Sequence, residues 1–395
     1  MPLRARRAEV ELRRLARSSP AVLVHGPRQC GKTTLVRSVL PDWHHVDLER
    51  PRDIALLRAD LEGWLDNHSE RVCIDEAQRL PELFPALRHA IDARGRKARF
   101  VLLGSASPSL MRTAAESLAG RLALLELTPF LAAELAGNRA GRGRWFWGGF
   151  PPVWARRSSR ERVEWLDDYL TAVLERDLPA LGIGLPPARL RKLVEMLVHV
   201  HGNLLNVSDL ARSLGVSVPT VSRDLDVLEG LFVTRRLQPF HANIQKRLTK
   251  SPKIYLRDTG LLHVLGGLRT PPELETWSRR GASFEGLVIE EIAALARERC
   301  VRPGLFFWRT EAGGEVDLLI TDGRRVVPIE IKLGSAIDHH ALRGLRQCLA
   351  DLGVARGYVV MGSGERTRLG RDIELVPWQD VVERRFDFGL GGRAR

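Results

Sequence analysis

Short apolar runs recur along the first third of the chain, and a helical stretch separates each run from the next. The runs lie at residues 21–24, 43–48, 71–78, 99–104 and 122–127, and the helical stretches at 35–40, 51–66, 82–94 and 107–119. Strands of a parallel sheet read as such runs, because helices cover both of their faces. The alternation therefore predicts an α/β domain built on a mostly parallel sheet.

The pattern changes after residue 186. Residues 206–228 read as a helix, a turn at Gly215 and a second helix, for which Ser217 is the expected N-cap residue. The residues expected to form the buried stripe of the second helix are Val218, Val221, Leu225 and Leu228. Two strand-like segments follow at 232–240 and 253–258. Together these elements predict a winged helix-turn-helix.

The C-terminal part again combines helix and strands. A helix is expected at 283–298, followed by strand-like segments at 305–310, 315–321 and 324–334, with a turn at Gly313 and Gly314. A separate α/β domain is therefore expected after residue 266.

A chain of 395 residues exceeds the size at which one core keeps growing, so several domains are expected. Residues 136–160 are rich in Gly, Arg and Trp without a regular apolar period, and they mark a boundary. The opening segment reads as a basic amphipathic helix with Val10, Leu12 and Leu15 available for packing. No apolar stretch approaches eighteen residues, so we expect a cytoplasmic protein with no membrane partner.

The charge of the chain is unusual, whereas its composition is ordinary. Apolar residues make up 44% and charged residues 28%, but the formal net charge is +13. Such a charge suits a polyanionic partner, with nucleic acid first and a membrane surface second, although a generally basic proteome is an alternative explanation. The four cysteines lie far apart, which indicates a reducing compartment and argues against structural zinc.

The most specific chemical signal is the segment AVLVHGPRQCGKTT at residues 21–34, which fits the G-x-x-x-x-G-K-[ST] pattern of a phosphate-binding P-loop. Glycine lets backbone N–H groups approach a polyphosphate closely, and the following helix N-terminus favours the same anion. The expected nucleotide-binding residues are Gly26, Pro27, Arg28, Gln29, Cys30, Gly31, Lys32, Thr33 and Thr34. Lys32 would reach the β- and γ-phosphates of ATP, and Thr33 would help to hold Mg²⁺.

Polar residues end two of the later strands. Asp75 and Glu76 follow the apolar run that begins at residue 71. Asp75 is expected to hold the Mg²⁺ shell, and Glu76 to orient or deprotonate the attacking water. Ser105 ends the next strand, where its side chain would face the γ-phosphate. Two acids after a strand can also be a solvated strand end, but their spacing from the P-loop favours catalysis.

The segments GPRQCGKTT, CIDEAQ and LLGSAS, followed by LAGR and LTPF, resemble the AAA+ ATPase core of a widespread prokaryotic family with an additional C-terminal domain. The resemblance implies that Ser105 is the first sensor. It also makes Arg121 a candidate finger that acts on the nucleotide of a neighbouring subunit, and a salt-bridged loop residue is the alternative. A homo-oligomer is therefore expected, with a hexameric ring as one form.

Residues 136–185 are similar to the small helical lid of such ATPases. Its GGFPP turn is a candidate for approaching the adenine or the phosphates. The aromatic residues of the segment are expected to pack the lid onto the core, with base stacking as the alternative; they are Trp145, Phe146, Trp147, Phe150 and Trp154.

The winged helix predicts a DNA contact through its second helix and its basic wing. The candidate DNA-binding residues are Pro219, Thr220, Ser222, Arg223, Lys246 and Arg247. Three acids on the second helix, Asp224, Asp226 and Glu229, count against this interpretation, because they would repel the DNA backbone. Use of the winged helix for protein contact, or as an extension of the lid, remains an alternative.

The last domain carries the spacing D-x12-E-x-K, with Asp317, Glu330 and Lys332 on two successive strands. This spacing matches the PD-(D/E)xK nuclease pattern, in which carboxylates hold a divalent metal and the lysine acts on the attacking water. Glu285 would add an acid from the helix. The arrangement resembles a restriction-endonuclease-like fold, which by itself does not establish cleavage.

The expected architecture is an α/β P-loop AAA+ core with a parallel sheet (1–135), a helical lid (136–185), a winged helix-turn-helix (186–265), a restriction-endonuclease-like domain (266–388) and a disordered tail (389–395). The leading hypothesis is an ATP- and Mg²⁺-dependent ATPase that binds DNA and couples hydrolysis to DNA remodelling or translocation. Two alternatives remain open, an ATP-regulated metal-dependent nuclease and a nucleotide-gated switch that binds a protein.

Overall fold

The computed structural model describes residues 4–390 except 69, 106–113, 115, 136–139, 181–182, 241–250, 312 and 336–338. The chain divides into two compact units. The first comprises Met1–Phe130, Phe150–Ala155 and Asp226–Val233, and the second comprises Leu131–Gly149, Arg156–Leu225 and Thr234–Arg395. The chain therefore passes between the units several times.

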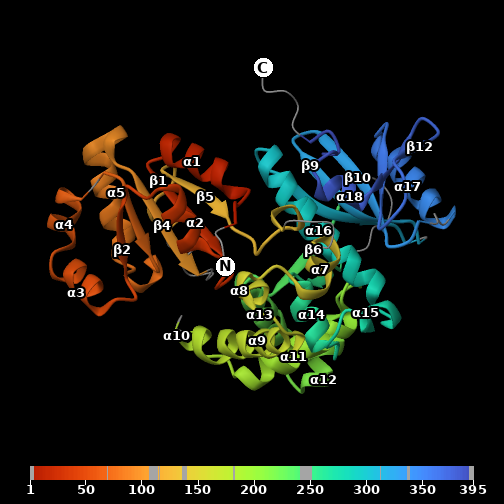
Figure 1. Ribbon diagram of the computed structural model, residues 1–395, viewed down its shortest axis with the longest axis horizontal. Coiled ribbons are helices and arrows are strands. Elements are labelled where there is room, and N and C mark those ends of the chain that lie inside the picture. Colours follow the sequence, from red (N-terminus) through yellow and green to blue (C-terminus); the bar gives the residue numbers. More distant parts are fainter. Residues whose placement is uncertain are drawn as a thin grey trace. The chain divides into compact units, whose positions relative to one another are not determined.

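The first unit is built on a parallel sheet (Figure 1). Among the described residues the sheet has five strands in the order β2-β3-β4-β1-β5, and every neighbouring pair is parallel. They are β1 (Ala21–Gly26), β2 (His44–Asp47), β3 (Val72–Asp75), β4 (Phe100–Ser105) and β5 (Leu122–Glu126). The predicted α/β fold with a parallel sheet is confirmed for this part of the chain.

Helices bury both faces of this sheet. They are α1 (Ala8–Ser18), α2 (Lys32–Val39), α3 (Pro51–Ala59), α4 (Leu61–Asn67) and α5 (Leu83–Arg94), with 3₁₀ turns η1 (Ala77–Arg79) and η2 (Gly95–Lys97). Because successive strand residues point to opposite faces, Val22 packs in one core with Leu12 and Leu35, whereas Leu23 packs in the other with Phe84. The short helix α8 (Pro151–Ala155) also belongs to this unit.

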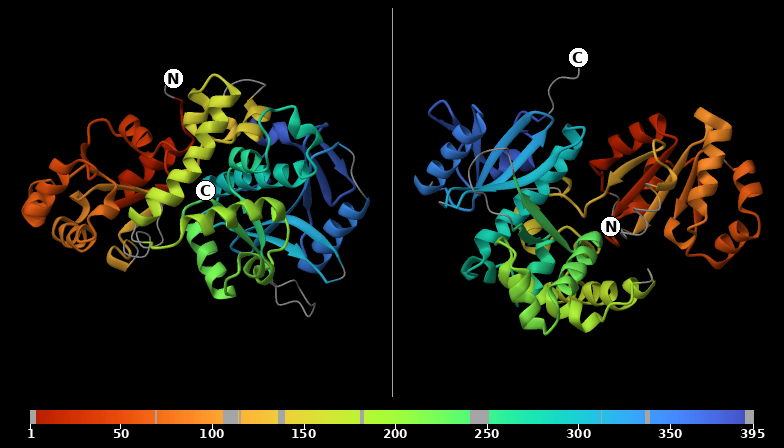
Figure 2. Two further views of the ribbon diagram at one scale, coloured as in Figure 1. Left: turned by 90° about the horizontal axis from the view of Figure 1, so that it is seen from below. Right: turned by 180° about the vertical axis from the view of Figure 1, so that it is seen from behind.

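The second unit is built on a mixed sheet. Its described residues form eight strands in the order β12-β13-β11-β10-β9-β8-β6-β7. They are β6 (Thr234–Pro239), β7 (Lys253–Leu256), β8 (Gly304–Arg309), β9 (Glu315–Asp322), β10 (Arg325–Lys332), β11 (Gly357–Met361), β12 (Thr367–Leu369) and β13 (Ile373–Pro377). β9 pairs antiparallel with both β8 and β10, whereas β10, β11 and β13 run parallel. The strands β8–β13, cyan to blue, can be followed from two further sides in Figure 2.

Two helices cover opposite faces of this mixed sheet. α16 (Arg280–Arg299) packs in one core with Leu318 and Ile320, and α17 (His339–Leu352) packs in another with Leu319. The remaining elements of the unit are η3 (Ala132–Glu134), α7 (Ala140–Trp147), α9 (Ser159–Ala172), a π-turn η4 (Val173–Asp177), α10 (Leu178–Ala180), α11 (Pro187–Val200), α12 (Val207–Leu214), α14 (Thr259–Leu265), α15 (Glu273–Thr276) and α18 (Trp378–Val382). α13 (Val218–Gly230) begins in the second unit and ends in the first.

The mixed sheet runs across the predicted boundary at residues 265 and 266. The two strands of the expected wing, β6 and β7, pair with each other, and β6 also pairs in parallel with β8. The expected wing is therefore part of the same sheet as the C-terminal strands.

Several expected elements differ in detail from the structure. The expected helix 51–66 is interrupted at Asp60, whose side chain accepts a hydrogen bond from the Gly63 amide and starts α4. Val10 was expected to be available for packing and Val218 to be buried, yet 78% and 43% of their surfaces are exposed. Most of the expected helix 107–119 lies outside the described residues.

The aromatic segment, which lacks a regular apolar period, contains α7 (Ala140–Trp147). The indole of Trp145 donates a hydrogen bond to Ser283 Oγ at 3.0 Å and contacts the ring of Phe284, and Phe146 stacks on His263. Trp145 and Phe146 therefore pack on α16 and α14 within the second unit, contrary to the expectation that they pack onto the ATPase core, whereas Phe150 and Trp154 belong to the first unit. None of the described helices has the length and apolar content that crossing a bilayer requires.

Candidate functional site

The P-loop connects the carboxyl end of β1 to the first turn of α2. Gly26 has φ +157°, and a Cβ at this position would lie 2.1 Å from the carbonyl oxygen of Leu127. Gly31, the N-cap residue of α2, has φ +100°, and Gln29 also has a left-handed backbone with φ +57°. Glycine tolerates such conformations best. Gly26 is thus required by the close approach of Leu127, and Gly31 by its left-handed backbone.

Lys32 is held inside the loop. Its side chain is buried, and Nζ donates hydrogen bonds to the carbonyl oxygens of Gly26 and Pro27 at 3.1 and 3.0 Å. The ammonium therefore lies where the backbone turns from strand to helix. A phosphate held by the loop amides would meet this positive charge.

Thr33 and Asp75 meet, although 42 positions separate them in the sequence. Thr33 Oγ1 donates to Asp75 Oδ2 at 2.6 Å. Asp75 ends β3, and Thr33 lies in the first turn of α2. Because Mg²⁺ prefers oxygen ligands, the hydroxyl and the carboxylate form a donor set that fits this ion.

Glu76 follows Asp75 but has a different side-chain partner. Its backbone is left-handed, with φ +53°, and its carboxylate accepts a hydrogen bond from Gln78 Nε2. Burial raises the pKa of Glu76, while the charge of Lys32 lowers it and that of Asp75 raises it. The net shift is upward, which makes this carboxylate a better proton acceptor. Backbone strain of this kind is often found at functional sites.

Ser105 and Arg121 lie at opposite ends of the sheet. Ser105 is the last residue of β4 and lies opposite Gly26 in the strand pairing, so its backbone adjoins the start of the P-loop. Its side chain is outside the described part. Arg121 directly precedes β5, at the amino-terminal edge, and makes two hydrogen bonds to Asp92 at 2.7 and 2.9 Å. Within this chain, Arg121 is therefore a salt-bridged residue, which was the alternative to the role of an arginine finger.

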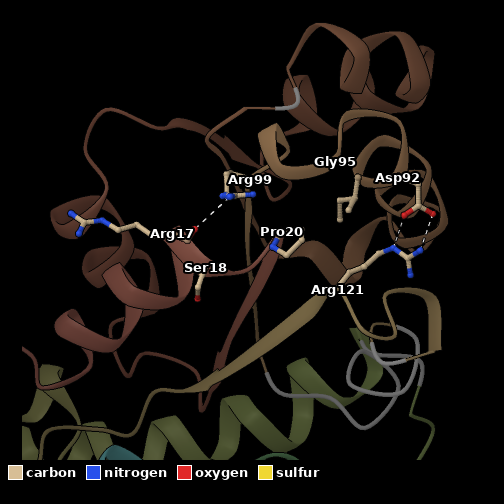
Figure 3. A pocket seen from close by; sticks show the side chains of 8 residues that line it. Arg17, Ser18, Pro20, Asp92, Gly95, Arg99 and Arg121 are labelled. Atoms are coloured by element: carbon tan, nitrogen blue, oxygen red, sulfur yellow. Dashed lines mark hydrogen bonds and ion pairs between the residues drawn. The ribbon is translucent and has the colours of Figure 1, made fainter. Parts of the chain in front are cut away.

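Two hollows lie at this amino-terminal edge, and Figure 3 shows one of them. Their volumes are about 500 and 640 Å³, and Arg17 and Arg99 line both. The other cationic residues that line them are Arg13, Arg71, Lys97 and Arg121. The acidic lining residues are Asp92 and Glu70, and Asp92 already pairs with Arg121. We call this surface the basic groove.

Arg6 is a P-loop contact that sequence reasoning missed. It donates hydrogen bonds to the carbonyl oxygens of Cys30 and Thr128 at 2.9 and 2.6 Å, and its guanidinium lies 4.9 Å from the ring centre of Phe130. The residue is buried. It fastens the P-loop to the segment after β5. The basic N-terminal sequence gave no signal that distinguishes this arginine from its neighbours.

The expected helix-turn-helix elements are present as α12 and α13. Gly215 ends α12 with φ +67°, and Ser217 Oγ accepts a hydrogen bond from the Thr220 amide at 3.4 Å. Pro219 and Arg223 are exposed, and Thr220 and Ser222 are half-buried. Lys246 and Arg247 lie outside the described residues.

One of the acids that counted against a DNA contact is not on the surface. Asp224 is fully buried, and Arg189 makes two hydrogen bonds to its carboxylate at 2.7 and 3.0 Å. Its charge is therefore neutralised inside the second unit. Asp226 is exposed and Glu229 is half-buried.

The structure brings the predicted nuclease residues together around an unpredicted lysine. Lys253 Nζ, on β7, lies 3.0 Å from Glu285, 2.6 Å from Glu315 and 3.2 Å from Asp317. Glu285 comes from α16, and the other two carboxylates come from β9. The segment KIYL gave no local signal for this role, because its partners are distant in sequence.

Glu330 and Lys332 form a neighbouring pair on β10, with Nζ and Oε1 2.8 Å apart. Burial, followed by the charge of Asp317, raises the pKa of both Glu330 and Glu285. In the described part of the chain, no group of three His, Cys, Asp or Glu residues is arranged to hold a metal ion. Because Lys253 already lies among the carboxylates, the residues do not fit the divalent metal that the nuclease pattern implies.

Comparisons with known proteins agree with the P-loop geometry. Residues 18–136 match the model of an AAA domain family, AAA_14, and residues 139–272 and 280–381 match two domains of unknown function, DUF8612 and DUF4143. Over 385 residues the chain is 42% identical to the uncharacterized proteins Mb2031c of Mycobacterium bovis and Rv2008c of Mycobacterium tuberculosis, which covers 97% of this chain and 85% of each relative.

Similar solved structures include the Walker-type ATPase PABY2304 of Pyrococcus abyssi, with 15% identity, a TM-score of 0.47 and coverage of 67% of this chain and 96% of that one. A RuvB variant of Thermotoga maritima shows 19% identity, a TM-score of 0.30 and coverage of 58% and 84%.

Proposed function

The chain belongs to the family of the mycobacterial proteins Mb2031c and Rv2008c and carries an AAA-type P-loop ATPase domain, and on this basis we propose that it is an ATP- and Mg²⁺-dependent ATPase that remodels or translocates DNA. The observation that carries the ATPase proposal is the 2.6 Å contact between Thr33 and Asp75. It joins the P-loop to the acidic strand end, as a site for a metal-bound nucleotide requires.

In the proposed site each residue has one task. The loop amides at 27–31 and the Lys32 ammonium bind the phosphates, and Thr33 and Asp75 hold Mg²⁺, which when bound neutralises phosphate charge. Glu76 accepts the proton of the attacking water, since its pKa is raised by burial. The polar end of β4 at Ser105 lies beside the loop and is proposed to sense the γ-phosphate.

Two substitutions test these roles. Glu76→Gln should keep ATP binding but lower turnover by about 10²- to 10⁴-fold, the usual contribution of a general base. Lys32→Ala should lower turnover by about 100-fold or more, because it removes the charge that meets the phosphates. The measurement is phosphate release, with exposed Glu82→Gln and Lys192→Ala as matched controls. Turnover that survives both site substitutions would refute the assignment.

The DNA part of the proposal rests on two surfaces. One is the exposed start of α13, with Pro219 and Arg223, where burial of Asp224 removes one of the acids expected to repel DNA. The other is the basic groove of the first unit, whose cations are mostly arginines suited to phosphate. The exposed large apolar residues of the described chain lie outside this groove, which favours phosphate contact over membrane insertion.

A salt series tests the groove. Arg17→Gln combined with Lys97→Gln should weaken duplex DNA binding and flatten the slope of log affinity against log salt by about 0.9 for each lost phosphate contact. Arg58→Gln, an exposed change on α3 outside the groove, should leave the slope unchanged. If the unsubstituted protein binds DNA with the same slope as the double variant, the groove is not the contact. If it does not bind DNA at all, the DNA proposal itself is wrong.

The nuclease alternative has support from the convergence of Glu285 and Asp317, but Lys253 lies where that mechanism would need a metal. We therefore do not propose metal-dependent cleavage. The switch alternative predicts nucleotide-dependent binding of a protein and no stimulation of turnover by DNA. Measuring the ATPase rate with single-stranded, duplex and branched DNA separates it from the remodelling proposal.

A further inference from the structure

The contact pattern of Lys253 is unusual for a lysine. Only 3% of its side chain is exposed, and its ammonium lies 2.6–3.2 Å from three carboxylates on two different elements. Nζ also lies 5.7 Å from the ring centre of Phe307. A lysine ammonium has three donors on a compact head. Its three donors match the three converging acceptors.

The carboxylate oxygens around Lys253 are also occupied by other donors of the protein. Tyr255 Oη donates to the same Glu285 oxygen as Lys253, at 2.5 Å, and the Ile331 amide donates to Asp317 Oδ2 at 3.0 Å. Arg309 pairs with the second oxygen of Glu315 at 3.0 Å. A divalent cation could reach these carboxylates only by displacing a buried positive charge.

Displacing that charge is unfavourable. Removing one partner of a buried ion pair leaves an uncompensated charge in a poorly solvated place. The chain contains 54 arginines but only seven lysines, and one of the seven occupies this position. The planar fork of arginine could not direct donors to three converging carboxylates from one nitrogen.

We propose that Lys253 is the resident cation of the carboxylate cluster formed by Glu285, Glu315 and Asp317, and that it excludes a divalent metal from this position. The ion pairs of this cluster then hold β7 against α16 and β9. Removal of the ammonium would let the three carboxylates close around a divalent cation, an arrangement that they do not have while Lys253 lies between them. Glu330 is a further ligand for that site, because its Oε2 is buried and makes no hydrogen bond within the described structure.

The proposal concerns the second unit, so it stands or falls independently of the ATPase. The test measures Mn²⁺ binding by electron paramagnetic resonance in the absence of nucleotide. It uses the full-length Asp75→Asn protein, which lacks the proposed P-loop metal ligand. This protein should bind no Mn²⁺ at the cluster. Adding Lys253→Met should create one Mn²⁺ site per chain, and adding Asp317→Asn should abolish it again. Asp75→Asn with the exposed change Lys192→Met should bind as Asp75→Asn alone does.

Two results would overturn the proposal. One is a Mn²⁺ site in the Asp75→Asn protein that disappears on Asp317→Asn, because a metal would then share the cluster with Lys253. The other is a folded Lys253→Met variant that gains no Mn²⁺. If the Lys253→Met variant does not fold, the proposal is tested by comparing two proteins, Asp75→Asn and Asp75→Asn with Asp317→Asn. The proposal requires that both bind the same amount of Mn²⁺.

Discussion

Two adjacent acids at the end of β3 have different environments. Asp75 accepts a hydrogen bond from the hydroxyl of Thr33. Glu76 instead has a left-handed backbone, and its carboxylate accepts a hydrogen bond from Gln78. The positive φ of Glu76 directs the two side chains to different partners. This difference in partners fits the proposed division, in which Asp75 holds Mg²⁺ and Glu76 accepts the proton of the attacking water.

The raised pKa of Glu76 predicts a pH dependence. A general base acts when it is deprotonated, so turnover should fall as the pH is lowered through the folded pKa, which burial raises above its usual 4.5. The profile of kcat against pH checks this, with Glu82→Gln as a control. A profile with the same acidic limb in the Glu76→Gln protein would show that another group titrates.

Residues within one short segment were predictable, and residues joined across the fold were not. The P-loop spacing predicted that Gly26, Gly31 and Lys32 share one strand-to-helix turn, and Lys32 Nζ indeed lies 3.1 Å from the carbonyl oxygen of Gly26 in that turn. Arg6 and Lys253 have no such local pattern, since each acts through partners far away in the sequence. The pairing of Asp224 with Arg189 was missed for the same reason.

At the scale of elements, the period of apolar residues predicted the strands of the parallel sheet within one to three residues. It failed where a local side-chain interaction competes with the period, as at Asp60, which starts a new helix. It also failed near a helix start, where Val218 has apolar spacing but is 43% exposed. The eight-stranded sheet could not be predicted, because the parallel pairing of β6 with β8 joins segments expected to lie in separate domains.

An ion-pair group ties α16 to the expected wing. Burial alone would raise the pKa of Glu290, but Arg235 and Arg257 outweigh it and lower the pKa to about 2. Arg257 donates to Glu290 Oε2 at 2.9 and 3.0 Å. A carboxylate with a lowered pKa stabilises the fold above its unfolded pKa, and this stability is lost as the pH falls toward 2.

Glu290→Gln should therefore destabilise the second unit by about 3 kcal/mol at neutral pH, because it leaves two arginines without their buried counter-ion. Chemical denaturation of the full chain measures the loss. The difference from the unsubstituted protein should shrink as the pH is lowered below 4, and a difference independent of pH would contradict the ion-pair account. The exposed Glu275→Gln change is the control.

At the scale of the whole molecule, assembly decides the role of Arg121. If the protein forms a ring, Arg121 would act as a finger only after leaving Asp92, with which it pairs in the single chain. Arg121→Ala should then abolish most ATP turnover. Asp92→Asn breaks the same ion pair but keeps the arginine, so it should leave most ATP turnover intact. Equal turnover in both variants, measured beside the native mass with ATP, would leave Arg121 as a structural residue.

The account depends first on whether the P-loop binds a triphosphate. Titration of the full chain with a fluorescent ATP analogue and Mg²⁺, beside Lys32→Ala, measures this directly. We predict saturable binding of one analogue per chain that Lys32→Ala weakens strongly and Lys192→Ala leaves unchanged. A folded protein that shows no saturable binding, or binding equal in all three, would contradict the account.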